Sequence, residues 1–207
     1  MVSNYSHLRG IEPFSLCDWP GHMSLVLFLA DCDFRCPTCH NRALAWEFSS
    51  LPVLEKDVVF ALISSRKSWL DGLVITGGEP TLHNELFDIC SDLKQFGLPV
   101  KVDSNGQRPH ILRELLASGL VHTFAVDVKG PWKYYQKLSG GKVDAQTAEA
   151  NLAEVFRLAE EFPGRVYFRC TQVPLLHDDD IETVRSYLPA GHDLTVQKYI
   201  PPQRIRR

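Results

Sequence analysis

Three of the six cysteines in this 207-residue chain are packed between positions 32 and 39, in the spacing Cys32-x3-Cys36-x2-Cys39. Thiolates this close along the chain can bind three corners of one 4Fe-4S cluster. Ordinary 4Fe-4S sites use four cysteines, so one iron here would lack a protein ligand. The motif therefore predicts a cluster with an open coordination position, which implies chemistry rather than a purely structural role.

A structural zinc ion is the alternative interpretation. Structural zinc sites have four ligands, commonly drawn from two separated pairs, and this spacing offers one group of three. His40 adjoins Cys39 and is poorly placed to bind the same metal, so Cys17 is the only further cysteine that could contribute. Cys90 and Cys170 lie in helix-like and strand-like stretches, where buried inert thiols are common. The spacing favours the cluster, and a non-catalytic zinc or electron-transfer protein remains the alternative.

Three polar motifs each follow an apolar stretch further along the chain. The first is Gly77-Gly78-Glu79-Pro80, whose glycines permit a close backbone approach or a positive φ. The second is Asp103-Ser104-Asn105-Gly106, and the third is the pair Asp127 and Lys129, which strand alternation places on one side of a sheet. Taken singly, the first motif is also typical of a tight turn, the second of an ordinary loop and the third of a surface ion pair.

Short apolar runs alternate with longer amphipathic segments, the pattern of repeated βα units and a parallel sheet. The predicted strands are Leu25–Ala30, Leu73–Thr76, Val100–Asp103, Phe124–Val128, Val166–Thr171 and Leu194–Gln197. The predicted helices are Glu55–Trp69, Asn84–Phe96, Pro109–Ser118, Asp144–Phe162 and Asp178–Leu188. Six units are two short of a full (β/α)8 barrel. We therefore expect one α/β domain over residues 1–207, an open partial (β/α)6 TIM-like barrel with its polar motifs on one rim.

The composition indicates no general affinity for nucleic acid or membranes. With 22 basic and 25 acidic residues, the net charge is -3. The first residues, MVSNYSHLRG, lack the regions of a signal peptide, and the longest apolar run, Leu25 to Ala30, is too short to span a bilayer. We expect a cytoplasmic protein, and in that reducing compartment clustered cysteines point to metal.

The motifs together match a known family. The stretch from Gly10 to Asn41, with IEPFSLCDWPG and LVLFLADCDFRCPTCHN, followed by ITGGEP, resembles the radical S-adenosylmethionine (SAM) activating proteins of glycyl-radical enzymes. It is most similar to the activating protein of anaerobic ribonucleoside-triphosphate reductase. VDSNG at 102–106, AVDVKG at 125–130 and QVPLLHDDD at 172–180 extend the resemblance through most of the chain. The resemblance implies a radical SAM oxidoreductase, EC 1.97.1.-, with the barrel of the radical SAM type.

The resemblance also implies roles for individual residues. Cys32, Cys36 and Cys39 would hold the 4Fe-4S cluster. SAM would be bound by Gly77, Gly78, Glu79, Pro80, Asp103, Ser104, Asn105, Asp127 and Lys129, with the GGEP segment at the amino group of the methionine moiety and Lys129 at its carboxylate. A monovalent cation, Na+ or K+, would lie beside that carboxylate, bound by Asp103, Ser104 and Asp127.

The chain departs from the family pattern at two positions. Thr38 stands where relatives have an aromatic residue that packs near the SAM adenine, and Asp31 stands where they have glycine. The cluster should be unaffected by either residue. Thr38 bears on the affinity for the adenine.

The implied reaction is reductive cleavage of SAM by the cluster, after reduction by a flavodoxin-like or ferredoxin-like donor. The resulting 5'-deoxyadenosyl radical would take a hydrogen from a glycine Cα of a partner glycyl-radical enzyme. A short, open barrel favours such a protein substrate because its side can admit a peptide loop. The alternative is a small-molecule enzyme resembling carboxydeazaguanine synthase. The terminal Arg204, Arg206 and Arg207 are a further hypothesis, as docking residues.

Overall fold

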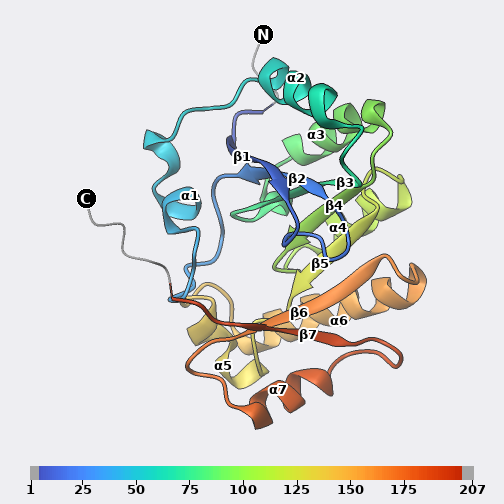
Figure 1. Ribbon diagram of the computed structural model, residues 1–207. Coiled ribbons are helices and arrows are strands. Elements are labelled where there is room, and N and C mark those ends of the chain that lie inside the picture. Colours follow the sequence, from blue (N-terminus) through green and yellow to red (C-terminus); the bar gives the residue numbers. More distant parts are fainter. Residues whose placement is uncertain (1–4, 202–207) are drawn as a thin grey trace.

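A single sheet of seven strands, in the order of the chain, organises the computed structural model, which describes residues 5–201 (Figure 1). The predicted docking residues Arg204, Arg206 and Arg207 lie outside this described range. The strands are β1 (Leu8–Ser15), β2 (Ser24–Leu29), β3 (Gly72–Gly77), β4 (Val100–Ser104), β5 (Thr123–Asp127), β6 (Val166–Gln172) and β7 (Leu194–Lys198).

The six strands β2 to β7 run parallel, as predicted. Within the described residues the sheet ends at β1 and β7, which do not pair with each other, so the barrel stays open. This confirms the open, partial TIM-like barrel. The sequence did not predict β1, which pairs antiparallel with β2 at the sheet edge. Its pattern is irregular because register shifts interrupt the pairing and Pro13 cannot donate to a ladder.

Helices connect the parallel strands and cover the outer face of the sheet (Figure 1). They are α1 (Arg42–Trp46), α2 (Lys56–Arg66), α3 (Glu85–Leu93), α4 (Pro109–Ala117), α5 (Trp132–Leu138), α6 (Ala145–Glu161) and α7 (Asp178–Arg185), with short 3-10 turns η1 (Phe48–Ser50), η2 (Pro80–Leu82) and η3 (Lys94–Phe96). The five predicted helices are confirmed as α2, α3, α4, α6 and α7, with slightly different ends. The short helices α1 and α5 were not predicted.

Helix α6 illustrates how the sequence sets these boundaries. The Asp144 carboxylate caps its first turn by accepting from the Thr147 N–H at 2.7 Å. One face of the helix, with Leu152 at its centre, is completely buried against the sheet. None of the helices in the described part of the chain is long and apolar enough to cross a membrane.

Two apolar clusters lie on opposite faces of the sheet. The large one joins the outward residues of the strands, such as Leu27 and Ile75, to the helices. The small one lies inside the barrel and consists of Trp19, Val26 and Val74. The remaining interior positions, on β4 to β6, are mostly polar, and this polar interior leads up to the site described below.

Replacing Leu152 with alanine should lower the free energy of unfolding by about 2–5 kcal/mol, because it leaves a cavity between α6 and the sheet. Glu149→Ala, on the exposed face of the same helix, should change it by less than about 0.5 kcal/mol. Denaturant titration of both variants measures the two values. Equal losses would contradict the assigned packing face.

Candidate active site

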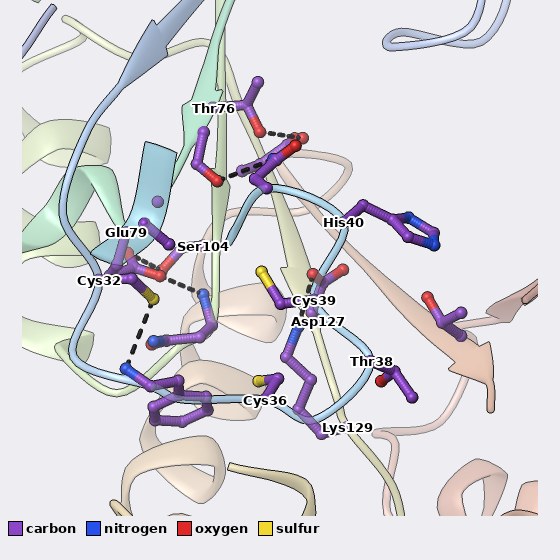
Figure 2. Close-up of a pocket in the computed structure, with 18 of the residues that line it drawn as sticks. Cys32, Cys36, Thr38, Cys39, His40, Thr76, Glu79, Ser104, Asp127 and Lys129 are labelled. Atoms are coloured by element: carbon purple, nitrogen blue, oxygen red, sulfur yellow. Dashed lines mark hydrogen bonds and ion pairs between the residues drawn. The ribbon is translucent and has the colours of Figure 1, made fainter. Parts of the chain in front are cut away.

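A cavity of about 270 Å³ lies at the carboxyl ends of the parallel strands, under the loop that carries the cysteines (Figure 2). We refer to residues 30–41 as the cysteine loop. Of the residues predicted for the site, the cavity is lined by Cys32, Cys36, Cys39, Gly77, Gly78, Glu79, Asp103, Ser104, Asn105, Asp127 and Lys129. Pro80 is the exception, because it is buried at the start of η2 and does not line the cavity. Cys36 and Asn105, which are 69 positions apart in sequence, thus lie at the same rim.

The cysteine loop begins with an unusual backbone conformation at Asp31, which has a φ of 65° and is the only described non-glycine residue with positive φ. Aspartate tolerates this left-handed region better than most residues because its short side chain can bond locally. Its Oδ1 accepts from the Cys32 N–H at 2.8 Å. Asp31 therefore adopts a left-handed conformation that a glycine, the residue expected here from the resemblance, would adopt without strain.

The three thiols face a common part of the cavity, whereas the His40 ring points away from them (Figure 2). A turn joins Cys36 to Cys39, whose N–H donates to the Cys36 carbonyl at 3.1 Å. The Nε2 of His40 lies 2.6 Å from the carbonyl oxygen of Ile200, and its ring stacks on Tyr199. His40 therefore joins the cysteine loop to the segment after β7 and does not complete a four-ligand zinc site.

The donor set fits a 4Fe-4S cluster with one iron lacking a protein ligand. Burial raises the pKa of the Cys32 thiol to about 12, and burial also raises the pKa of Cys36. Thiolates in such surroundings need a nearby positive charge, which bound iron supplies. In the described chain no fourth cysteine lines the cavity: Cys17 is exposed elsewhere, and Cys90 and Cys170 are buried, as predicted.

The glycine pair at the end of β3 packs directly against the start of the cysteine loop. Gly77 has a φ of +118°, and a Cβ at Gly78 would lie 1.7 Å from the carbonyl oxygen of Asp31. The Gly78 N–H donates to the Leu29 carbonyl at 2.7 Å, and the Glu79 N–H donates to the Asp31 carbonyl at 2.8 Å. Only glycine fits this contact, so the pair fixes the position of the cysteine loop as well as lining the cavity.

Glu79 is almost completely buried and accepts hydrogen bonds from four donors. They are the N–H and hydroxyl of Thr81, at 3.2 and 2.5 Å, the Ser104 hydroxyl at 2.9 Å and the Asn105 N–H at 2.7 Å. Burial raises its pKa to about 7, although these hydrogen bonds act in the opposite direction. Glu79 thereby links the segment after β3 to the loop after β4.

Arg169 on β6 bridges Asp103 and Asp127, two of the three predicted cation ligands. Its guanidinium contacts Asp103 at 3.3 Å and Asp127 at 2.9 Å. Asp103 also pairs with the fully buried Lys101, and Asp127 pairs with Lys129 at 3.0 Å. Burial alone would raise the pKa of Asp127, but the charges of Arg169 and Lys129 outweigh it and lower the pKa to about 2.

The predicted alkali cation site finds no support in this arrangement. Asp103 and Asp127 already share the positive charge of Arg169, and the Ser104 hydroxyl donates to Glu79 instead of facing them. A guanidinium therefore lies between the two carboxylates that were expected to bind Na+ or K+.

The prediction missed several residues that belong to the cavity, among them Thr76, Asn41 and Arg169. The Thr76 hydroxyl donates to Asp103 at 3.1 Å, and the Asn41 amide donates to the Gly77 carbonyl at 3.0 Å. The signal for Arg169 was present, because polar residues alternate with buried ones along β6. That alternation places Arg169 on the interior face.

The fold and the site together define an α/β domain with a three-cysteine cavity, suited to a metal cluster, at the carboxyl ends of an open parallel barrel. A family model described as the Radical SAM superfamily matches residues 26–188, so the chain belongs to this superfamily. The family implies a 4Fe-4S cluster and SAM as cofactors, and one solved relative, Streptococcus suis SuiB, is described as bound to S-adenosylmethionine.

Individual relatives give a finer comparison. A Methanocaldococcus jannaschii protein, whose name assigns it provisionally as a glycyl-radical enzyme activating enzyme, is 30% identical over 201 residues, covering 94% of this chain and 80% of its own length. The 7-carboxy-7-deazaguanine synthase of Hyperthermus butylicus is 26% identical over 170 residues, covering 82% of this chain and 63% of its own length. SuiB matches 86% of this chain with a TM-score of 0.62 at 15% identity, and the match spans 40% of SuiB. That last likeness shows the fold alone.

Arg169→Met should lower the free energy of unfolding by about 3–5 kcal/mol, because each interior carboxylate loses a partner. Arg169→Lys should recover only part of this loss, since an ammonium cannot bridge both carboxylates as a guanidinium does.

The wild-type Tm should be the same in KCl, NaCl and choline chloride at equal ionic strength. A Tm that rises specifically with K+ or Na+ would restore the alkali cation site.

Glu79 should make stability depend on pH between about 4.5 and 7. Its pKa is raised from 4.5 to about 7 on folding, so the folded state holds the proton more tightly. The unfolding free energy of the wild type, relative to Glu79→Gln, should therefore fall as pH rises through this window and level off above it. Denaturant titrations at several pH values measure the difference, and parallel curves for the two proteins would refute the raised pKa.

Proposed function

We propose that this chain, as a single radical SAM domain, activates a glycyl-radical enzyme. The partner that we propose is anaerobic ribonucleoside-triphosphate reductase. The observation that carries the proposal is the 30% identity to an activating-enzyme relative, which extends over nearly the whole of this chain and most of the relative. The unclosed sheet adds support, since an open barrel can admit a peptide loop between its edges. The finer choice of partner rests on the sequence resemblance alone.

In this proposal the cysteine loop holds the cluster through Cys32, Cys36 and Cys39. When bound, the reduced cluster and SAM would supply one-electron cleavage of SAM to methionine and a 5'-deoxyadenosyl radical able to take hydrogen from a glycine Cα of the partner. The electron would come from a flavodoxin-like or ferredoxin-like donor. The protein residues bind and orient SAM, exclude water and keep the reacting carbons close together.

Lys129 is the residue best placed to bind the SAM carboxylate. Burial alone would lower its pKa, but the negative charges of the Asp127 carboxylate and the Cys36 thiolate raise the pKa above its usual range. The ammonium therefore stays charged at the cavity wall, close to the cysteine loop (Figure 2). Gly77 to Glu79 would bind the amino group of SAM on the opposite wall. The carboxylate and the amino group of the methionine moiety would therefore bind to different walls of the cavity.

The function is tested by incubating the anaerobically reduced protein and SAM with an anaerobic ribonucleotide reductase. Electron paramagnetic resonance should show a glycyl doublet in the partner. Cys36→Ala should abolish both the cluster and SAM cleavage, because a cluster held by two thiolates is not retained. The matched variant Cys17→Ala, whose thiol is exposed outside the cavity, should keep both. Cluster content in Cys36→Ala equal to wild type would overturn the site.

The similarity to 7-carboxy-7-deazaguanine synthase supports a second candidate, a small-molecule radical SAM enzyme. The same reduced protein distinguishes the two functions. Formation of 7-carboxy-7-deazaguanine from its precursor, without a glycyl doublet in any reductase tested, would favour the synthase. Zinc without iron or sulfide in anaerobically purified protein would exclude both.

A further inference from the structure

Two arginines, one in the cysteine loop and one at the start of α1, lie against one aromatic ring outside the cavity. The guanidinium carbons of Arg35 and Arg42 lie 5.6 and 5.4 Å from the ring centroid of Trp46, and both arginines are exposed. Arg35 donates to the carbonyls of Cys32 and Phe34, and Arg42 donates to a carbonyl of the same loop. Within residues 5–201 neither forms an ion pair with a carboxylate.

Two exposed lysines stand on a neighbouring segment. The Arg35 N–H donates to the Ser139 carbonyl at 2.8 Å, and a Cβ at Gly140 would lie only 2.1 Å from the Arg35 carbonyl oxygen. The turn after α5 therefore packs against the cysteine loop, and Lys137 and Lys142 flank that turn. We call Arg35, Arg42, Lys137 and Lys142 the basic face.

Asp31 and Asp33 lie in the cysteine loop beside Arg35, but Asp31 accepts from the Cys32 N–H and Asp33 pairs with Arg108. Few other nearby carboxylates oppose the basic face. Glu47 follows Trp46, and Asp144 follows Lys142 by two positions, but the Asp144 carboxylate caps α6. The chain as a whole has a net charge of -3, so the basic face is a local exception on a mildly acidic protein. Such a local excess of one sign attracts and orients a partner of the opposite sign.

The position of the basic face restricts which partner it can serve. It adjoins the cluster ligands, since the Arg35 guanidinium bonds to the Cys32 carbonyl, yet none of its four residues lines the cavity. Helices α1 and α5 and the loop between β2 and α1 lie on the same side of the molecule (Figure 1). A protein bound there would contact the cysteine loop from outside and leave the cavity mouth free, whereas a glycine-bearing substrate must enter the cavity.

We propose that the basic face is the docking site for a small electron-transfer protein whose redox group is surrounded by acidic residues. This proposal rests on the proposed function, because it requires a cluster that receives an electron from outside. In each encounter the reduced donor loses one electron and the oxidised cluster gains it. Transient redox contacts are small and guided by charge, so the encounter should weaken as salt increases.

The test compares the charge reversal R35E/R42E with the matched reversal R66E/K67E at the end of α2, remote from the cysteine loop. The probe is an acidic flavodoxin. Its affinity for the cluster-loaded protein is read from flavin fluorescence, and cluster reduction by its reduced form is followed by stopped-flow absorbance without SAM. R35E/R42E should weaken binding and slow reduction at least about tenfold, and R66E/K67E should change neither. The wild-type rate should fall with added salt.

An uncharged reductant provides the integrity control. Photoreduced 5-deazariboflavin should reduce the cluster of every variant at the wild-type rate. Because Arg35 bonds within the cysteine loop, the pair K137E/K142E serves as a second test that touches no loop contact. It should slow flavodoxin-dependent reduction in the same direction, by a smaller factor.

The outcomes separate this proposal from the proposed function. If R35E/R42E and K137E/K142E both keep the wild-type affinity for flavodoxin and the wild-type reduction rate, the docking site is overturned. A second outcome would also overturn the docking site. If these variants bind flavodoxin normally but form no glycyl radical even after reduction by 5-deazariboflavin, the basic face binds the substrate protein instead. Normal docking without any glycyl radical would instead refute the activase function and leave the docking site supported.

Discussion

The site depends on one backbone contact between the ends of two neighbouring strands. After β2 and β3 stop pairing as a regular ladder, Gly78 and Glu79 still donate to the carbonyls of Leu29 and Asp31. The absence of a side chain at Gly78 allows this approach, because a Cβ would overlap the Asp31 carbonyl. The contact joins the segment that carries the cysteines to the segment that lines the opposite wall. The GGEP motif is therefore as much a support for the cysteine loop as a surface for a ligand.

A second constraint comes from the interior of the barrel. Parallel barrels usually fill their centre with layers of apolar side chains. Here the interior positions of β4 to β6 carry a connected row of charges, Lys101, Asp103, Arg169, Asp127 and Lys129. Each carboxylate lies between two cations, so the burial of each charge is compensated by direct pairing. The row fixes Lys129 next to the cysteine loop without requiring a metal ion between the carboxylates.

Much of the fold and of the site could be predicted from local sequence. The cysteines are neighbours in the chain, and the three polar motifs follow apolar strands, so topology alone brings them to one rim. Arg169 could not be placed in the same way, because its partners lie 42 and 66 positions earlier, and only the strand order and the β5–β6 register, which pairs Asp127 with Arg169, bring them together. Strand β1 escaped prediction because its pattern is broken by register shifts, and α1 and α5 are too short for a periodic signal.

The interior charges and the basic face act on different sides of the cysteine loop. Inside, three cations and two carboxylates give the row from Lys101 to Lys129 a net charge of +1, held in place by hydrogen bonds. Fixed charges of this kind need little reorganisation when an anionic group binds, which suits the proposed orientation of a carboxylate at Lys129. Outside, Arg35 and Arg42 are held on Trp46 but remain exposed to solvent. A loop with a preorganised inner wall and an accessible charged outer wall can receive an electron from one side while its cavity holds a substrate on the other.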